Sequence, residues 1–188
     1  MVLPRGFRSS PLTRRALVDV AVDLTEDVGL AAMTLRDVTR RAGVSHASVT
    51  YHFGDKAGLL TALAADGYRM LGDTLREAHR TRRTFLEVGV AYVRFAVTHR
   101  AHFGAMFQPE LHHRDDAELR AAKAVTSTLL YGTDHPDDGQ RAAGVAAWAI
   151  VHGIASLWLT GNLPEELGHD PEEITRVLAG RLKVRGRG

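Results

Sequence analysis

The 188-residue sequence contains no cysteine, which excludes disulfide bonds, thiolate zinc sites, iron–sulfur clusters and a cysteine nucleophile. Aromatic residues make up only 6% of the chain, and its 6 prolines and 18 glycines are too few for a low-complexity or collagen-like sequence. A strong charge bias is also missing, because 24 lysines and arginines stand against 22 aspartates and glutamates. The net charge of +2 does not by itself indicate a nucleic-acid-binding protein. The composition is that of an ordinary soluble globular chain and is compatible with a reducing cytoplasm.

Basic residues are concentrated at both ends of the chain, where they have no acidic neighbours. Such ends are usually solvated tails, although a basic arm beside a DNA-reading unit can add phosphate contacts. The N-terminal charges are not followed by the apolar stretch of a secretory signal. The residues are Arg5, Arg8, Arg14 and Arg15 at one end and Arg181, Lys183, Arg185 and Arg187 at the other.

Apolar residues recur at three- and four-residue steps along most of the chain, which predicts amphipathic helices. The first stripe runs from Leu17 to Val28 and stops at Gly29. The last helix is expected to begin with Asp170 as N-cap and Pro171 at its first position. No series of period-two segments with hairpin turns is present, so the sequence predicts an all-α fold. Further helices are predicted at 34–41, 45–52, from about 55 to 71, at 85–99 and at 117–130, with a loop at 132–139.

One long hydrophobic run extends from Ala142 to Leu159 without a charged residue. Its length just reaches that of a membrane-spanning helix. The run is nevertheless rich in alanine and glycine, contains His152 and Ser156, and lacks flanking basic clusters. A helix that is apolar all round is expected to be buried on several sides. We therefore predict a core helix, covered by its own domain and by a second subunit, and no membrane contact. Solubility without detergent would count against the membrane alternative.

The most informative segment reads TLRDVTRRAGVSHASVTYHFGDKAGLL, residues 34–60. It contains two short helical patterns separated by Ala42, Gly43 and Val44. Gly43 permits the positive φ that ends one helix and turns the chain sharply. Ser45 is suited to cap the second helix, and Val44 can fill the apolar corner of the turn. The spacing predicts a helix-turn-helix over about 34–53.

The second helix of this motif is expected to expose small or polar side chains, which allow a close approach to base edges in a major groove. The same pattern occurs in helical hairpins whose polar face meets only water, so the motif alone leaves both interpretations open. An apolar helix directly before the motif, and a helix that opens with Asp55 and Lys56 directly after it, favour DNA binding. The exposed residues are Ser45, His46, Ala47, Ser48, Thr50 and His52.

From about Thr13 to Leu63 the chain resembles the N-terminal DNA-binding domain of the tetracycline-repressor (TetR) family of bacterial regulators. The resemblance rests on the helix before the motif, on TLRDVTRRAGVS, on YHF and on the DK of GDKAGLL. In the C-terminal half, Trp148, His152 and Gly153 of AWAIVHGIASLWLTG resemble the Trp–His–Gly type of C-terminal domain in this family. The resemblance implies a DNA-binding domain over residues 1–56 and a helical effector-binding and dimerisation domain over residues 57–188.

The family resemblance also implies the function and the partners. It implies a homodimeric transcription regulator of the bacterial cytoplasm and nucleoid, usually a repressor, which a small-molecule effector releases from a double-stranded DNA operator. The dimer is expected to form through helices at about 140–160 and 171–184. By position, the DNA contacts would be Thr34 and Arg36 on the backbone, Ser45, His46, Ala47 and Ser48 at the leading end of the recognition helix, and Thr50, His52 and Lys56 on phosphates or adjacent bases.

The motif departs from the family pattern at two positions. A tyrosine is frequent where Thr50 stands, so the phosphate contact is shortened or lost there, and Tyr51 is expected to point elsewhere. Thr39 replaces a small alanine that commonly packs between the two helices, which adjusts their separation. His46 can donate to a guanine or a phosphate, or remain exposed without a specific contact. Lys56 is the better phosphate ligand, because its charge needs little geometric precision.

The C-terminal half is expected to hold an effector pocket, both by resemblance and because its apolar faces carry larger side chains. For each residue taken singly, ordinary core packing is the competing interpretation. Trp148 and His152 are one turn apart and could present a ring and a polar atom to one cavity; alternatively, His152 is a hydrogen-bonded structural histidine. The lining candidates are Tyr92, Phe95, His99, Phe103, Met106, Phe107, Trp148 and His152.

The sequence predicts no metal, cofactor or catalytic site. His99, His102, His112 and His113 could suit zinc, nickel or copper, but no carboxylate stands at HExxH spacing and ten histidines make chance pairs frequent. Residues 43–47 superficially match a hydrolase nucleophile elbow, but an alanine replaces its second glycine and the segment follows a helix. No phosphate-binding loop or dinucleotide fingerprint is present. The alternative to a regulator is a helical ligand-binding or enzymatic bundle that never touches DNA.

Overall fold

The computed structural model describes residues 13–181 apart from residue 83 and residues 132–137. Every regular element in these residues is a helix and none is a strand, which confirms the predicted all-α fold. The elements are α1 (Arg14–Ala32), α2 (Leu35–Ala42), α3 (His46–Phe53), α4 (Lys56–Arg82), α5 (Phe85–Thr98), α6 (Arg100–Met106), η1 (Pro109–Leu111), α7 (Ala117–Tyr131), α8 (Asp138–Leu159), η2 (Glu165–Leu167) and α9 (Pro171–Gly180).

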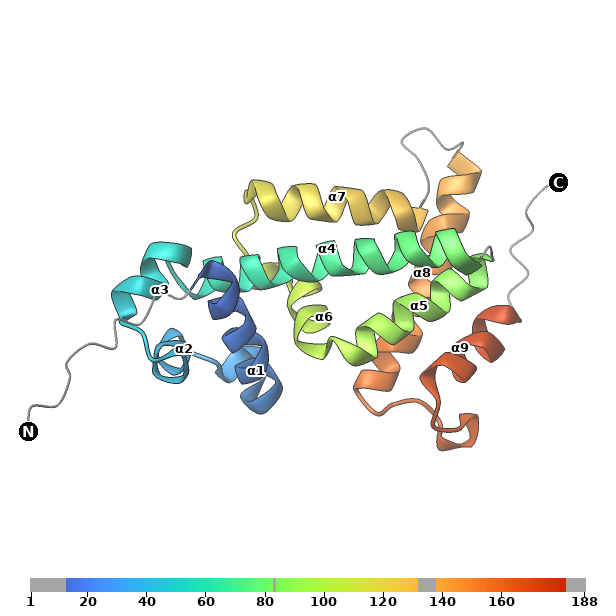
Figure 1. The fold of residues 1–188 in the computed structure, drawn as a ribbon. Helices are drawn as coiled ribbons and strands as arrows, with labels where there is room; N and C mark the ends of the chain where they lie inside the picture. Colours follow the sequence, from blue (N-terminus) through green and yellow to red (C-terminus); the bar gives the residue numbers. More distant parts are fainter. Residues whose placement is uncertain (1–12, 83, 132–137, 182–188) are drawn as a thin grey trace, which may run out of the picture.

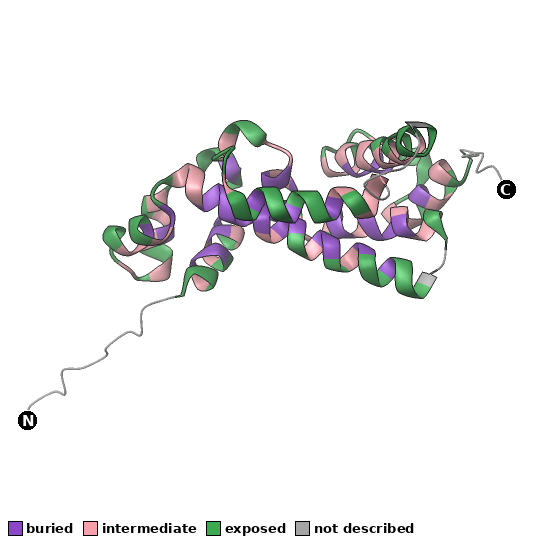
Figure 2. Ribbon diagram, turned by 90° about the horizontal axis from the view of Figure 1, so that it is seen from above, coloured by how far each residue is buried: buried purple, intermediate pink, exposed green. Residues whose placement is uncertain are grey.

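The molecule is elongated, with α1–α3 at one end and α8 and α9 toward the other (Figure 1). Helix α4 runs between the two ends, with α7 along one side and α5 along another (Figure 1). Its buried side follows the apolar stripe of the sequence and includes Leu59, Leu60, Leu63, Leu71 and Leu75. Figure 2 shows buried residues concentrated along the middle of the molecule, alternating with exposed residues on the outer sides of the helices. Helix α4 is therefore the element that connects the N-terminal helices to the bundle.

In α1, a helix-breaking glycine is followed by apolar residues that are buried in the core. Gly29 has φ 80° and interrupts the helix, as its position predicts. The chain nevertheless makes a further helical turn, because Leu30 and Met33 are buried beyond the break. Leu17 and Ala21 on the preceding part of α1 are fully buried, so both parts hold the helix against its neighbours.

The predicted helix at 85–99 is slightly shorter, and a second helix that was not predicted follows it at once. His99 has φ −123° and ψ 53°, which ends α5, and its carbonyl accepts the first hydrogen bond of α6, from the amide of Phe103 (2.8 Å). Neither glycine nor proline marks this break, so the sequence contains little local indication of it. The break lets α6 turn away from α5 and pack against α1 and α4.

Helix α8 is less buried than its composition predicts. Among the residues of α8 whose burial the structure describes, Val151, Ile154 and Ala155 alone are buried, while Val145 and Leu157 are 40% and 44% exposed. Its own domain therefore covers this helix in part, through α5, α7 and α9, and the expected cover by a second subunit stays a prediction. In the part of the chain that the structure describes, one helical stretch, Gly139–Leu159, has the length and composition to span a membrane, and 22% of its most apolar window is buried.

The ends of the last predicted elements also differ from the prediction. Helix α8 already begins at Asp138, so the expected loop at 132–139 lies largely outside the described residues. Helix α9 has the predicted start, since Asp170 Oδ1 accepts hydrogen bonds from the amides of Glu172 (2.8 Å) and Glu173 (3.3 Å). It ends at Gly180, and positions 182–184 of the expected dimer helix lie outside the described part.

Candidate nucleic-acid interface and ligand cavity

Helices α2 and α3 form the predicted helix-turn-helix. Gly43 has φ 67° in the left-handed region and ends α2, as its position predicts. Thr34 and Asp37 form a reciprocal capping box at the start of α2. The Ser45 hydroxyl accepts a hydrogen bond from the Ser48 amide (3.2 Å) and caps α3. These three local devices fix the angle at which α3 leaves the turn.

The outward face of α3 carries small and polar side chains. Ser45, His46, Ala47 and Thr50 are exposed as predicted, whereas Ser48 and His52 are half-buried. On the inner face Val49 is fully buried and Phe53 is 8% exposed, which anchors the helix to the rest of the N-terminal unit. Helix α3 lies at the end of the molecule far from α8 and α9 (Figure 1). A second macromolecule can therefore approach this face without meeting the bundle.

Tyr51 belongs to the same exposed region, although the sequence predicted that it would point away from the DNA-facing side of α3. Its side chain is 87% exposed, the largest value among the exposed large apolar residues that the structure describes. Ala47 and Tyr51 are four residues apart on α3 and therefore share a face of the helix. The spacing from Ala47 is the feature of the sequence that could have identified Tyr51.

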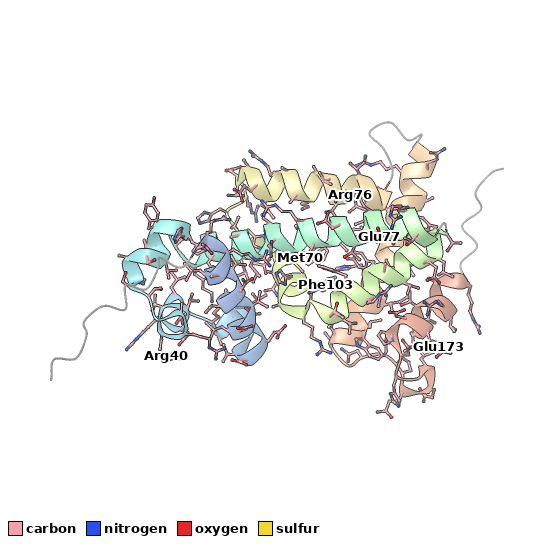
Figure 3. All side chains as sticks on the ribbon, viewed as in Figure 1. Arg40, Met70, Arg76, Glu77, Phe103 and Glu173 are labelled. Carbon is pink, nitrogen blue, oxygen red and sulfur yellow. The ribbon has the colours of Figure 1, made fainter. Side chains whose placement is uncertain are left out.

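The basic side chains around α3 differ in whether they already form ion pairs or hydrogen bonds within the protein. Arg36 is exposed, and none of the described residues forms an ion pair with it. Arg40 projects from the end of the molecule (Figure 3) and pairs with Asp37 (2.9 Å). The Lys56 Nζ donates a hydrogen bond to the carbonyl of Ala31 (2.9 Å) near the end of α1. Arg36 is thus the most available of these three charges.

The Thr34 hydroxyl is also committed locally. It donates to Asp37 Oδ2 (2.6 Å) and accepts from the Asp37 amide (3.2 Å). The hydrogen bond from Thr34 holds the pKa of Asp37 below its ordinary value, so this carboxylate stays charged beside Arg36 and Arg40. Thr34 therefore positions α2 in addition to any contact of its own.

Arg14 and Arg15, which could have belonged to a basic arm, instead lie in α1 and pack against the bundle. The Arg15 guanidinium reaches both carboxylate oxygens of Asp66 on α4 (2.8 and 2.9 Å). The His102 Nε2 on α6 lies 3.3 Å from the same carboxylate. Arg14 lies over the Phe53 ring at 5.4 Å and 3.6 Å from Glu118 on α7. These contacts join α1, and through it the helix-turn-helix, to α4, α6 and α7.

The bundle contains a cavity of about 330 Å³ between α4, α6, α7 and α8. Of the residues predicted to line an effector pocket, Met106, Phe107 and Trp148 do line this cavity. Phe95 and His99 line a separate hollow of about 600 Å³ between α4 and α5. The remaining lining residues, which sequence reasoning did not identify, are Tyr68, Leu71, Pro109, Lys123, Thr126, Ser127, Leu130 and Tyr131.

Tyr92, Phe103 and His152 lie in an aromatic cluster that adjoins Phe107 and Trp148. Phe103 is buried inside the bundle (Figure 3). The Tyr92 hydroxyl accepts a hydrogen bond from Trp148 Nε1 (3.2 Å) and lies 2.9 Å from His152 Nδ1. Burial lowers the pKa of His152 and raises that of Tyr92, so both side chains stay neutral and are within hydrogen-bond distance of each other. His152 is therefore a hydrogen-bonded member of the core as well as a neighbour of the cavity.

The histidines considered for a metal site are not gathered around one point. The rings of His99 and His102 lie 6.0 Å apart and edge to face. His113 instead pairs with Asp55 (3.1 Å) at the start of α4. Within the described residues, no group of three or more histidines, aspartates and glutamates is arranged to hold a metal ion.

A helix-turn-helix with a small, polar outward face, carried on a helical bundle with an apolar cavity, defines a DNA-binding transcription regulator. Residues 17–63 match the model of the tetR family of bacterial regulatory proteins, and residues 85–182 match the tetracyclin repressor-like C-terminal domain. The chain belongs to the TetR family. It is a helix-turn-helix transcription regulator rather than an enzyme, and regulators of this family bind operator DNA and dimerise.

Individual relatives agree with this assignment. The chain is 28% identical over 163 residues to the HTH-type transcriptional regulator BetI of Cronobacter sakazakii, covering 81% of each chain. A solved protein of unknown function from Rhodococcus sp. RHA1 superposes with a TM-score of 0.75 at 27% identity, over 95% of this chain and 96% of the other. The TetR family regulator PfmR from Thermus thermophilus shares the fold, with a TM-score of 0.65 at 16% identity over 87% and 94%.

Proposed function

We propose that the chain is a repressor that binds a palindromic operator as a homodimer and leaves it when a small molecule binds the bundle. The observation that carries this proposal is the outward face of α3, whose side chains apart from Tyr51 are small or polar and which lies at one accessible end of the molecule. Each subunit inserts residues 45–52 into a major groove. The two grooves lie about 34–36 Å apart, or a multiple of that distance.

The proposed DNA contacts divide by position along the motif. Ser45, His46, Ala47 and Ser48 form the first turn of α3 and approach base edges, while the half-buried His52 approaches the flank. Arg36 meets a phosphate and Thr50 adds a hydroxyl contact, whereas a Thr34 contact requires its hydroxyl to exchange Asp37 for the phosphate. Lys56 retains two of its three N–H donors after its hydrogen bond to Ala31, so it can still meet a phosphate. Tyr51, at 87% exposure, adds a large flat side chain to the same surface.

The proposed dimer interface is formed by α8 and α9. Both helices leave apolar side chains exposed, with Val145 at 40%, Leu157 at 44% and Val177 at 45%. They lie toward the end of the molecule opposite α3, which leaves both recognition helices of a dimer available to DNA (Figure 1). We place the functional division at about residues 56 and 57, where α4 begins, and the protein in the cytoplasm, associated with the nucleoid.

Release by an effector requires a difference in affinity between two dimer geometries. The effector must bind more tightly to the geometry whose recognition helices no longer match the operator spacing. A ligand with equal affinity for both geometries would leave DNA binding unchanged however tightly it bound.

In vitro selection from random DNA tests operator recognition. We expect the wild type to enrich a palindrome, and a Ser48→Arg variant to lose or alter it, because the new side chain fills the groove-facing side of α3. Salt-sensitive binding without an enriched motif would contradict sequence-specific recognition, and so would an unchanged motif in the variant. An absence of binding at low salt would leave only the ligand-binding bundle.

The salt dependence of operator binding tests the phosphate contacts. Each phosphate contact that is lost should reduce the slope of log K against log salt by about 1. We expect this change in Arg36→Ala and in Lys56→Ala. The control is Arg80→Ala, an exposed arginine near the far end of α4 that pairs with Glu77. Slopes equal to that of the control would remove both assignments.

A further inference from the structure

Two adjoining cavities of opposite character lie beside α7, and we call them the inner and the outer compartment. The inner compartment is the 330 Å³ space between α4, α6, α7 and α8. The outer compartment, about 350 Å³, lies between α4, η1 and the start of α7. Tyr68, Met106, Pro109 and Lys123 line both, so the two spaces adjoin along these side chains and together are called the groove along α7.

The inner compartment is suited to an apolar body. Four aromatic side chains line it, with the rings of Tyr131 and Trp148 5.4 Å apart and those of Tyr68 and Phe107 6.1 Å apart. Its buried polar groups are already satisfied within the protein. The Tyr68 hydroxyl donates to the Met106 carbonyl (3.1 Å), and burial raises the pKa of Tyr68 to about 12. The compartment therefore offers ring surfaces and few unused hydrogen-bonding groups.

The outer compartment is basic. Its lining includes His112, Arg114, Arg120 and Lys123, and no aspartate or glutamate lines either compartment. Arg120 has a distant partner in the fully exposed Asp115 (3.8 Å), whereas Arg114 and Lys123 form no ion pair with any described residue. Such a cluster of cations at the mouth of an apolar space attracts an anionic group.

An unsatisfied atom in the outer compartment gives independent support. The His112 Nε2 is buried and has no hydrogen-bond partner among the described residues. Buried polar atoms are nearly always paired, so an unpaired one at a cavity indicates a missing partner. The ring also interacts with the backbone of Ala105, and Glu110 is the acidic group near it and Lys123 the basic one. A polar head group in this compartment could supply the partner that His112 lacks.

Two other hollows of the described structure are less suitable. The space of about 600 Å³ between α4 and α5 is lined by both Glu77 and Arg94, and the space of about 540 Å³ beside α1 by both Glu26 and Arg100. Each has charges of both signs, and neither has a wall of several aromatic rings. Of the hollows compared in the described part of the chain, the groove along α7 is the one that combines such a wall with cations and no carboxylate.

We propose that this groove binds an amphipathic anion, with an apolar body among the rings of the inner compartment and a carboxylate or phosphate against Lys123, Arg114 and Arg120. The inference rests on the proposed function, because it names the chemical class of the effector. A cationic ligand is disfavoured, since it would meet like charge at the mouth and no carboxylate inside.

Matched decyl compounds test the sign of the head group. A Trp158→Phe background leaves Trp148, which lines the inner compartment, as the single tryptophan and hence as a fluorescent probe. Decanoate, decyl phosphate, 1-decanol and decyltrimethylammonium are titrated below their micelle concentrations. We expect saturable binding of at least one anion, about tenfold or more tighter than decanol, as one charge-assisted contact provides. Which anion binds more tightly distinguishes a carboxylate from a phosphate ligand.

Two charge variants locate the head group. Lys123→Gln should weaken anion binding about tenfold without changing decanol binding, and Lys123→Glu should shift the preference toward decyltrimethylammonium. Arg80→Gln, outside the groove, should change neither. Equal binding of decanol and the anions, tighter binding of the cation to the wild type, or no saturable change in Trp148 fluorescence would overturn the inference.

Operator binding measured on the same samples separates the two proposals. Intact operator binding without anion binding would remove the ligand class and leave the regulator. Anion binding that does not change operator affinity would support the ligand class and remove its role as the releasing effector.

Discussion

The Tyr92 hydroxyl connects two half-buried polar groups that have no other described partner. It accepts from Trp148 Nε1 and lies 2.9 Å from His152 Nδ1, while its own ring is fully buried. Removing the oxygen would therefore leave two polar atoms unpaired beside an aromatic cluster. Unpaired polar groups cost more than the hydrogen bonds themselves contribute.

Tyr92→Phe is expected to lower the free energy of unfolding by about 1–3 kcal/mol. Tyr131→Phe serves as the control, because Tyr131 is half-buried and water can replace its hydroxyl contacts. Urea denaturation of both variants measures the difference. Equal losses in the two variants would show that the Tyr92 hydroxyl has no special role.

Asp66 is expected to make the stability of the N-terminal unit depend on acidity. The hydrogen bond from His102 and the charge of Arg15 hold the pKa of Asp66 below its ordinary value of 3.8. A depressed pKa in the folded state means that the charged form stabilises the fold. This stabilisation is present above the ordinary value and is lost as the pH falls through the lower folded value.

Asp66→Asn should therefore destabilise the protein at pH 7 by about 1–2 kcal/mol, since it removes charge-assisted hydrogen bonds. The difference from the wild type should shrink as the pH falls below 3.8. Denaturant unfolding between pH 7 and pH 3 measures it. Asp19→Asn removes an exposed partner of the same Arg15 and should cost less than about 0.5 kcal/mol. A pH-independent deficit in Asp66→Asn would contradict the linkage.

At the scale of single elements, the junction of α3 and α4 depends on a close backbone approach. A Cβ atom on Gly58 would lie 1.9 Å from the carbonyl oxygen of Phe53, the last residue of α3. The backbone would have to shift to accommodate any side chain there. Because α3 carries the proposed DNA-reading face, the shift would also change how that face is presented.

Gly58→Ala is expected to cost about 1–3 kcal/mol of stability, as overpacking does, and to weaken operator binding. Gly72→Ala is a matched control in the same helix, where the new Cβ would lie 3.4 Å from the Thr126 hydroxyl. Thermal unfolding and operator titration compare the two variants. If both keep full operator affinity, the α3–α4 junction does not set the position of the recognition helix.

The elements that could be predicted from the sequence are those with local causes. The caps Thr34, Ser45 and Asp170 and the turn at Gly43 are where residue type and spacing predict them. The break at His99 could not be predicted, because it depends on α6 packing against α1 and α4 rather than on a helix breaker.

The candidate site divides in the same way. The helix-turn-helix is formed by residues close in sequence, so its face could be read from the pattern, with Tyr51 as the omission. The cavity is formed by four helices from distant parts of the chain. The sequence pattern therefore does not distinguish the aromatic residues that line it, such as Phe107 and Trp148, from those that pack behind it, such as Tyr92 and Phe103. Lys123 and Tyr131 became identifiable only once α7 was placed beside α4.

For the whole molecule, the dimer interface determines whether two recognition helices act together. Leu157→Glu introduces a charge on the exposed apolar side of α8, where it would be buried in the proposed dimer. We expect a monomer by analytical ultracentrifugation. Operator affinity should fall by roughly 10²–10⁴, because the second half-site no longer binds intramolecularly.

Val125→Glu on α7 is the matched control, since Val125 is 46% exposed and Leu157 is 44% exposed. It should remain dimeric and bind the operator as the wild type does. A dimeric Leu157→Glu, or a monomeric Val125→Glu, would place the interface elsewhere.

The length of α4 converts a small tilt at its bundle end into a larger displacement at the end next to α3. Its 27 residues form one continuous helix, which is about 40 Å long at about 1.5 Å per residue. A tilt of about 5° about its bundle end would move its first turn by about 3.5 Å, close to the rise of about 3.4 Å per base pair. The first turn of α4 follows α3 directly. A small rotation of α4 in the bundle would thus displace the recognition helix by about the rise of one base pair.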